Sequence, residues 1–337
     1  MRILIFKKYR VQIAKYFNKK YSYIQKFNFL KNNKMAFRDY VTRLGDIVQA
    51  MLDAEPPSIA ADSPVHEKVD AIIYHIASSD VEAARSVYNS IIPKPQSIVD
   101  YRIGHLIAYN NLTELVEPFS KFMFAEDRDT GFLPLHLAVY LGDIETVKKI
   151  VDCRFNLDMS SPERILARRF FDHRCNDDGL SVFEIALLHN QADIVAFLVF
   201  RSVKRDVIPF HIMSVPAAIK LVSLNYGDVT EEIFERLKEL GVDFNQNLYG
   251  MTFLHLAARH GSRRIVLALL AVGADPKLRK AGDTLPVETA VFAGNYSVVL
   301  DLFKTPVHEF SNYVAVYALL QGAGQDAILR AFCRGPE

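Results

Sequence analysis

The chain has 337 residues, of which half are apolar and 23% are charged, and its formal net charge is +1 at pH 7. These values are ordinary for a soluble globular protein with one long repeat array or two domains. No run of about 18 or more apolar residues occurs, which excludes a typical membrane-spanning helix. The three cysteines are too few for a disulfide framework and fit a reducing, intracellular location.

The first 34 residues form a basic segment unlike the rest of the chain. They contain ten Lys or Arg residues and no Asp or Glu, which leaves 30 basic and 39 acidic residues in the remainder. Three interpretations stay open. The segment is a mitochondrial-type presequence, a basic arm for anionic lipid or nucleic acid, or a stretch absent from a mature protein whose translation starts at Met35.

A single helix and a linker are expected next. Residues 36–53 place five apolar side chains on one helical stripe: Val41, Leu44, Ile47, Val48 and Met51. The following stretch is rich in Pro, Ser and Ala and has no period, which is typical of a linker. The expected parts of the chain are therefore a basic extension at 1–34, a helix with its linker at 35–64, and a repeat array at 65–333.

From about residue 66 onward, one pattern of two short helices joined by a tight turn recurs. Residues 69–91 predict one helix that ends near Ser78–Ser79 and a second that begins after Asp80, a favourable N-cap residue. Residues 102–123 have the same shape, with Asn110–Asn111 at the turn. We interpret both segments as degraded copies of one unit.

The next two units, residues 127–152 and 177–200, carry the pattern more clearly. Asp143 is placed to cap the second helix of the first unit, and Asn190 stands at the turn of the second, where asparagine tolerates a left-handed conformation. Gly131 of the first unit and Gly179 of the second are 48 residues apart. About 15 extra residues therefore lie between them, and we place this insertion near 154–175.

Residues 250–276 are the clearest unit. Gly261 stands at the turn, where a residue without a Cβ suits a left-handed conformation, and Gly273 ends the second helix. Ala257 and Ala290 are 33 residues apart. A fixed period between about 20 and 50 residues is typical of stacked repeat proteins.

Three further units follow from this register, at 208–247, 282–303 and 312–332, the last as a terminal cap. A unit of two short helices cannot bury its apolar faces alone, so neighbouring units must cover them. We therefore predict an all-α solenoid of about seven stacked helical hairpins.

The residues of 250–276 resemble the ankyrin repeat. Thirteen of them stand at matching positions: Gly250, Thr252, Leu254, His255, Ala257, Ala258, Gly261, Val266, Leu269, Leu270, Gly273, Ala274 and Asp275. Phe253 replaces the usual proline. Residues 127–152 and 177–200 share the motif, although Glu184 replaces its histidine. The resemblance implies an ankyrin-type stack in which His136 and His255 are structural and hydrogen-bond backbone groups of neighbouring repeats.

No catalytic, cofactor or metal site is expected. The chain has no glycine-rich phosphate loop, nucleophile elbow or His-Glu-x-x-His motif. A zinc site built on Cys153, His173 and Cys175 is the alternative to buried or incidental thiols, but zinc sites need four ligands at paired short spacings.

A small acidic group at Glu126, Asp127 and Asp129 is the other metal candidate. We expect these residues at the tip of a hairpin loop, where charges are solvated, and therefore do not predict metal binding.

Partners are expected at the loop tips and on the exposed side of the first helices, because the resemblance implies that these line a concave surface. The candidate partner-binding residues are Arg128, Phe132, Tyr140, Met251, Arg259 and His260. Exposed aromatic and Arg side chains are typical anchors of interfaces. The alternative for each residue is packing on a neighbour or plain solvation. The insertion at 154–175 is a further candidate for specificity.

These features predict an adaptor or scaffold that binds one or more proteins, and not an enzyme, cofactor protein or small-molecule receptor. The alternative is a bacterial effector that enters a host cell and uses its repeats to engage a host protein, with or without a cryptic enzymatic activity. The acidic body argues against nucleic acid as a partner. The expected location is the cytoplasm, or a host cell in the alternative.

Overall fold

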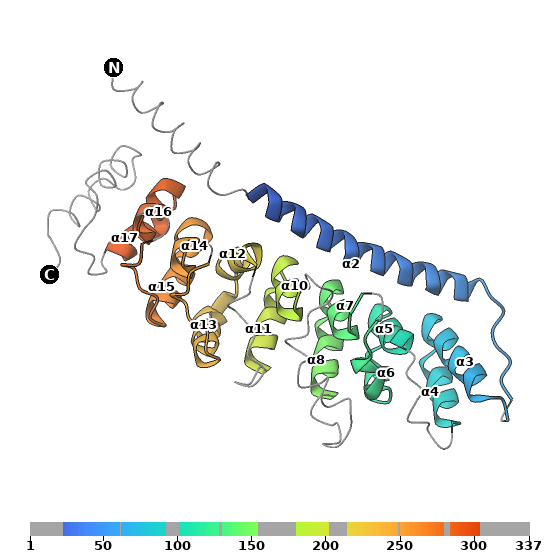
Figure 1. Ribbon diagram of the computed structural model, residues 1–337. Coiled ribbons are helices and arrows are strands. Elements are labelled where there is room, and N and C mark those ends of the chain that lie inside the picture. Colours follow the sequence, from blue (N-terminus) through green and yellow to red (C-terminus); the bar gives the residue numbers. More distant parts are fainter. Residues whose placement is uncertain are drawn as a thin grey trace. The chain divides into compact units, whose positions relative to one another are not determined.

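A computed structural model of the chain describes residues 23–60, 62–91, 101–127, 130–153, 180–201, 214–248, 250–279 and 284–303. The chain divides into two compact units, Met1–Lys94 and Pro95–Glu337, and each is described here by itself (Figure 1). The described residues contain helices and no β-strand, and one isolated bridge joins Leu248 and Met251. The predicted all-α class is confirmed.

The described residues of the first unit form three helices, α2 (Tyr23–Leu52), α3 (Val65–Ala77) and α4 (Val81–Asn89). Helix α2 begins well before the expected start at residue 36 and crosses the boundary expected at residue 34. On the expected stripe Leu44 is buried and the other four side chains are half-buried, as an amphipathic helix requires. The described residues between α2 and α3 contain no helix, as expected for a linker.

Helices α3 and α4 form the hairpin predicted from residues 69–91 and pack on each other. Ser79 adopts a left-handed conformation with φ 61°. The Asp80 carboxylate then accepts a hydrogen bond of 3.0 Å from the amide of Ala83, which caps the first turn of α4. The turn and the cap lie where the sequence predicts them.

The described residues of the second unit form six helix pairs. In chain order the pairs are α5 (Tyr101–Tyr109) with α6 (Thr113–Val116), α7 (Pro134–Leu141) with α8 (Ile144–Cys153), α10 (Val182–Leu188) with α11 (Ala192–Arg201), α12 (Val215–Ser223) with α13 (Thr230–Glu239), α14 (Phe253–His260) with α15 (Arg263–Ala271), and α16 (Pro286–Ala293) with α17 (Tyr296–Phe303). The 3-10 helix η1 (Ser120–Phe124) follows α6, and the 3-10 helix η5 (Gly227–Val229) precedes α13. The predicted insertion at 154–175 and terminal unit at 312–332 lie outside the described residues.

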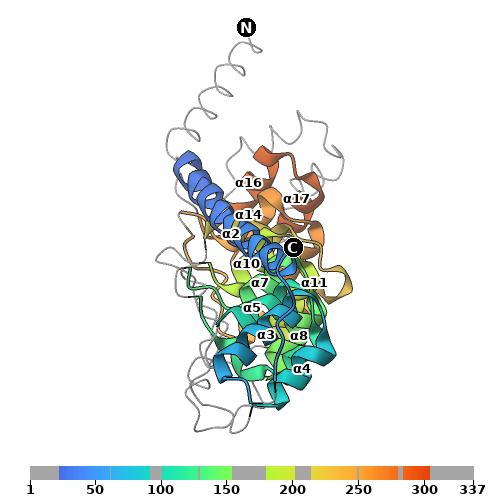
Figure 2. The ribbon, with the colours of Figure 1, turned by 90° about the vertical axis from the view of Figure 1, so that its right-hand side faces the viewer.

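These pairs stack into two rows (Figures 1 and 2). The first row consists of α5, α7, α10, α12, α14 and α16, each packed on the next, and the second row consists of α6, α8, α11, α13, α15 and α17. The facing sides of the rows are apolar, with Leu135, Ala186, Ala257 and Ala290 fully buried. The predicted solenoid of helical hairpins is confirmed, and every repeat depends on its neighbours to cover its apolar faces.

In α5, α10 and α14 a buried polar side chain ties the repeat to the next one. In α14 the Nδ1 atom of His255 lies 2.8 Å from Thr252 Oγ1, and its Nε2–H donates to the carbonyl of Thr284 in the following repeat at 2.9 Å. Both ring nitrogens are used and the side chain is fully buried. The structural role expected for His255 is confirmed.

His105 makes the same link from α5, because its Nε2–H donates to the carbonyl of Phe132 at 2.9 Å. The sequence analysis missed this residue. His136 and His255 each stand six residues before the turn residue, and His105 stands six residues before Asn111. That offset is a signal that could have identified it.

Glu184 replaces the histidine in α10 with a carboxylate that only accepts. Its Oε2 atom accepts from the Ser181 amide at 3.2 Å, and its Oε1 atom accepts from the Ser214 amide of the next repeat at 2.9 Å. The next repeat therefore offers an N–H group to Glu184, whereas it offers a carbonyl group to His105 and to His255. The exchange of histidine for glutamate matches this reversal of hydrogen-bond polarity.

The turns between the two helices of a repeat use left-handed residues. Gly142 and Gly294 have φ 80° and 75°, and Asn111 and Asn190 have φ 54° and 59° at the same position. Glycine carries no steric penalty there, and asparagine tolerates the conformation better than most residues. The left-handed turn predicted at Asn190 is confirmed.

Gly261 is the exception, and the left-handed conformation expected for it is wrong. Its backbone is extended, with φ −84° and ψ 168°. A Cβ atom at this position would lie 2.7 Å from the carbonyl oxygen of Val222 in the preceding first-row helix. Glycine is needed here because α12 approaches too closely for any side chain, not because of its backbone angles.

We expect Gly294→Asn and Gly261→Asn to have different effects on stability. A Cβ atom added at Gly294 would meet open space, so asparagine should cost about 1 kcal/mol or less there. At Gly261 the side chain would displace α12, and overpacking of this kind costs about 1–3 kcal/mol. Urea denaturation followed by circular dichroism measures both values. Equal losses in the two variants would contradict the steric explanation.

We also expect Glu184→His to destabilise the protein by about 1–3 kcal/mol, although histidine occupies the same position in three other repeats. A neutral imidazole offers one acceptor, so one of the buried amides of Ser181 and Ser214 would lose its partner. The exposed Glu145→His is the matched control in the same denaturation experiment. An increase in stability of the Glu184→His variant would show that the assignment of these hydrogen bonds is wrong.

Candidate partner-binding surface

The six residues predicted to bind a partner fall into three groups. Arg128 lies outside the described residues. Phe132 and Met251 are buried at 2% and 6% exposure, since these hairpin-tip side chains turn into the core. Tyr140 is half-buried, whereas Arg259 and His260 are exposed. The structure therefore brings only the last three to an accessible surface, and a binding role for any of the six stays a prediction.

Tyr140, Arg259 and His260 share one register on the first row. Tyr140 and Arg259 each stand two residues before the turn glycine of their repeat, and His260 stands one residue before it. At the corresponding positions, His189 follows the last residue of α10, one residue before Asn190, and Phe292 of α16 stands two residues before Gly294 and is 39% exposed. These side chains occupy the turn end of successive first-row helices.

Contacts between neighbouring repeats join these positions into a continuous line. The rings of Tyr140 and His189 meet edge to face with centroids 4.7 Å apart. Next to His189, the side chain of Asn190 accepts a hydrogen bond of 2.6 Å from Lys220 Nζ of α12. Helix α12 in turn packs on α14, which carries Arg259 and His260.

The line continues from α14 to α16. The amide nitrogen of the Asn295 side chain donates to the carbonyl oxygens of Ala258 and Gly261, at 3.2 and 3.0 Å. We name the resulting set the first-row surface. It consists of Tyr140, His189, Lys220, Arg259, His260 and Phe292.

The sequence analysis missed three members of this surface, His189, Lys220 and Phe292. His189 and Phe292 are found by counting back from Asn190 and Gly294, so the register of the turns contains this information. Lys220 is not found in that way, because the segment between α12 and α13 is longer than the other turns and includes η5. Its place follows only from its hydrogen bond to Asn190.

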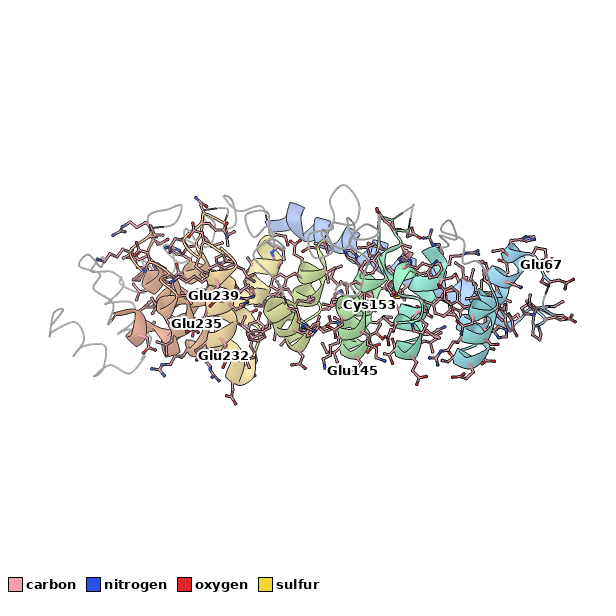
Figure 3. All side chains as sticks on the ribbon, turned by 90° about the horizontal axis from the view of Figure 1, so that it is seen from below. Glu67, Glu145, Cys153, Glu232, Glu235 and Glu239 are labelled. Carbon is pink, nitrogen blue, oxygen red and sulfur yellow. The ribbon has the colours of Figure 1, made fainter. Side chains whose placement is uncertain are left out.

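The first and second rows differ in charge. Within the first-row helices the carboxylates are Glu184 and Glu288, and both are buried at 2% and 3% exposure. The second row carries several exposed acidic side chains, among them Glu145 of α8 and Glu232, Glu235 and Glu239 of α13 (Figure 3). The exposed charges of the first-row helices are therefore cationic.

Arginines of the second row are held in ion pairs that cross between repeats. Arg264 binds Glu231 in a fork and also contacts Asp228 at 3.1 Å. These hydrogen bonds raise the pKa of Arg264 and lower that of Glu231. Arg263 forms a similar fork with Asp301, at 2.6 and 3.0 Å. These ion pairs link neighbouring repeats and occupy the guanidinium groups of Arg263 and Arg264.

Arg259 of the first row differs from these arginines. It is exposed, and within the described part of the chain it has no hydrogen-bond or ion-pair partner. The pKa of the adjacent His260 is lowered, mainly because burial disfavours its charged form and secondarily because Arg259 is close. At pH 7 the fixed positive charges of the first-row surface are therefore Lys220 and Arg259.

Within the acidic group, Asp127 has a structural role, and Asp129 lies outside the described residues. Asp127 is fully buried, and its carboxylate accepts from the amide and the hydroxyl of Thr130 at 2.9 and 2.8 Å. The expectation that its charge is solvated is wrong, because the carboxylate closes the loop from inside. Among the described residues no cluster of three potential metal ligands occurs.

Cys153, the one zinc candidate that lies within the described residues, is a buried thiol. Its Sγ atom is 3.9 Å from the carbonyl oxygen of Val116, and 4% of the residue is exposed. Burial raises the pKa of this thiol to about 11, and the nearby carboxylates of Glu117 and Asp152 add to the shift. A thiol in this state is a poor nucleophile and a poor metal ligand at neutral pH.

The comparisons with known proteins agree with this architecture. Residues 249–278, which contain α14 and α15, match the ankyrin repeat family. The chain contains an ankyrin repeat. It is 24% identical to "Ankyrin repeat protein nuc-2" of Neurospora crassa over 290 residues, which cover 76% of this chain and 26% of that protein. The chain thus spans about a quarter of the length of this relative.

Two solved ankyrin repeat domains are also similar to the chain. The domain of Bcl-3 is 19% identical and covers 69% of this chain and 97% of its own length, with a TM-score of 0.49. The domain of human ASB11 is 15% identical and covers 68% of this chain and 95% of its own length, with a TM-score of 0.42.

An ankyrin repeat supports a role in protein–protein interaction, since such repeats are generally binding modules. No helix within the described residues combines the length and the apolar character that a membrane crossing requires.

We expect Cys153 to resist alkylation in the folded protein. Its burial and raised pKa leave little thiolate at pH 8, so iodoacetamide should label it at least about tenfold more slowly than in the urea-unfolded chain. Mass spectrometry of the peptide that contains Cys153 measures this rate separately from the other cysteines. Equal rates in the folded and unfolded chain would show that the thiol is accessible.

Proposed function

We propose that this ankyrin repeat protein is an adaptor that binds a partner protein across the first-row surface. The partner would lie along the turn ends of α7, α10, α12, α14 and α16 and contact several repeats at once. Each repeat supplies one or two side chains, so affinity and specificity come from the combination of repeats and not from one pocket.

The observation that carries this proposal is the shared register of exposed or half-exposed side chains on successive first-row helices. Tyr140, Arg259 and Phe292 stand at the same position of three repeats. Tyr and Arg are the residue types most often found as energetic anchors at interfaces. Arg259 is exposed and has no partner among the described residues, so it is available for a partner protein's carboxylate or carbonyl groups.

The second-row surface supports the proposal by contrast. Its residues Arg201, Arg263 and Arg264 already pair with acidic residues of neighbouring repeats. These pairs stabilise the stack. A partner that used them would first have to break contacts between repeats.

The test compares partner capture by the full chain with capture by two triple variants. Tyr140→Ala, Arg259→Glu and His260→Ala alter the first-row surface. Phe200→Ala, Lys238→Glu and Glu232→Ala are the matched control on exposed second-row positions. We expect affinity isolation with quantitative mass spectrometry to show a partner that the first variant loses by at least about tenfold and the control retains.

Site-specific photo-crosslinking makes the same test without relying on loss of binding. A photoreactive phenylalanine at position 140 should crosslink to the partner, and the same residue at position 200 should not. Crosslinking from position 200 alone would move the binding site to the second row. Unchanged capture by the first triple variant would also contradict the proposal.

A further inference from the structure

The first-row surface has an ordered distribution of chemistry along the stack. Tyr140 stands at one end, next to Leu141, which is 39% exposed. Phe292 stands at the other end with the same exposure. Between them lie the basic residues Lys220 and Arg259 and the histidines His189 and His260. The surface is therefore apolar at its ends and cationic in its middle.

Nothing acidic on these helices offsets the cationic middle. The two carboxylates of the first-row helices are buried and accept hydrogen bonds from backbone amides, Glu184 from Ser181 and Ser214, and Glu288 from Leu285. The carboxylates that are exposed on helices of this unit belong to the second row, apart from Asp228 of η5, which pairs with Arg264. An anionic ligand on the first-row surface meets no carboxylate on the same helices.

From this arrangement we infer that the partner presents an extended peptide segment with acidic residues at its centre and apolar residues at both ends. This inference rests on the proposed function and names the chemistry of the partner at the same surface. Central Asp or Glu side chains pair with Lys220 and Arg259, and the flanking apolar residues pack on Tyr140 and Phe292.

The length of the segment follows from the spacing of the helices. Four helix-to-helix intervals separate α7 from α16 along the first row. Packed helices lie about 8–10 Å apart, so the surface is about 32–40 Å long. An extended chain rises about 3.3 Å per residue. A segment of about 10–12 residues therefore reaches from Tyr140 to Phe292.

A peptide fits this surface better than a nucleic acid does. Binding to phosphates draws its affinity from many Lys and Arg contacts, and only Lys220 and Arg259 carry fixed charges here. A nucleic acid backbone also offers nothing apolar to Leu141 and Phe292. The exposed glutamates of α13 would repel any longer polyanion that extended toward the second row.

The test starts with a library of random 12-residue peptides displayed on phage and selected on the full 337-residue chain. We expect enrichment of Asp and Glu at the central positions and of aromatic or aliphatic residues near both ends. The most enriched peptide is then synthesised in two further versions, one with its Asp and Glu replaced by Asn and Gln and one with them replaced by Lys.

Fluorescence anisotropy with these peptides measures the contribution of charge. The Asn/Gln version should bind at least about tenfold more weakly, and raising NaCl from about 50 to 500 mM should weaken the acidic version by a similar factor, because exposed charges are screened by salt. The variant Lys220→Glu/Arg259→Glu should lose the acidic peptide and gain the Lys version. The second-row control Lys148→Glu/Lys238→Glu should keep the affinities of the unmodified chain.

Other outcomes would overturn the inference. Selected peptides without central acidic residues, whose binding is lost on Tyr140→Ala/Phe292→Ala, would refute the acidic ligand and leave the proposed adaptor surface intact. Failure to enrich any peptide, or peptides unaffected by all first-row variants, would refute a linear segment at this surface, and the crosslinking from position 140 would then decide the proposed function. Displacement of the selected peptide by a single-stranded 20-nucleotide RNA at equal concentration would favour nucleic acid instead.

Discussion

The hydrogen bond between the start of one first-row helix and the backbone of the next repeat is the interaction on which the stack depends. It is buried, as at His255 and Thr284, so its loss would leave a polar group without water to replace the partner. It also sets the register between repeats, because a neighbour shifted by one residue would present the wrong group. Glu184 shows how strict this is, since the side chain changed together with the polarity of its partner.

A stack held in this way leaves one edge of each first-row helix without a structural task. The start of the helix carries the capping side chain, and its apolar faces cover the neighbours. The turn end is different, because the left-handed residue there forms the turn with its own backbone. Side chains just before it, such as Tyr140 and Phe292, are therefore the ones that vary in chemistry without harm to the stack. This is a physical reason why a binding surface forms at these positions.

The α12 repeat is the place where the regular pattern changes. Its helix has Ala217 where other repeats have histidine or glutamate, and η5 lengthens the connection to α13. The next turn changes with it, since Gly261 is extended and lies against the Val222 carbonyl. Lys220 and Arg259 stand on either side of this junction. An irregularity of the fold thus lies in the cationic middle of the first-row surface.

The sequence by itself determined the class of fold, the position of most helices and the turn residues, because a 33-residue period and the spacing of apolar residues are local properties. It also determined the register that contains Tyr140, Arg259 and His260. Only the tertiary structure decided which candidates reach the surface. Phe132 and Met251 look like exposed tips in the sequence but are buried, and Gly261 is needed for the approach of another helix. The physical reason is that burial and close approach depend on the neighbouring repeat, which a local pattern does not describe.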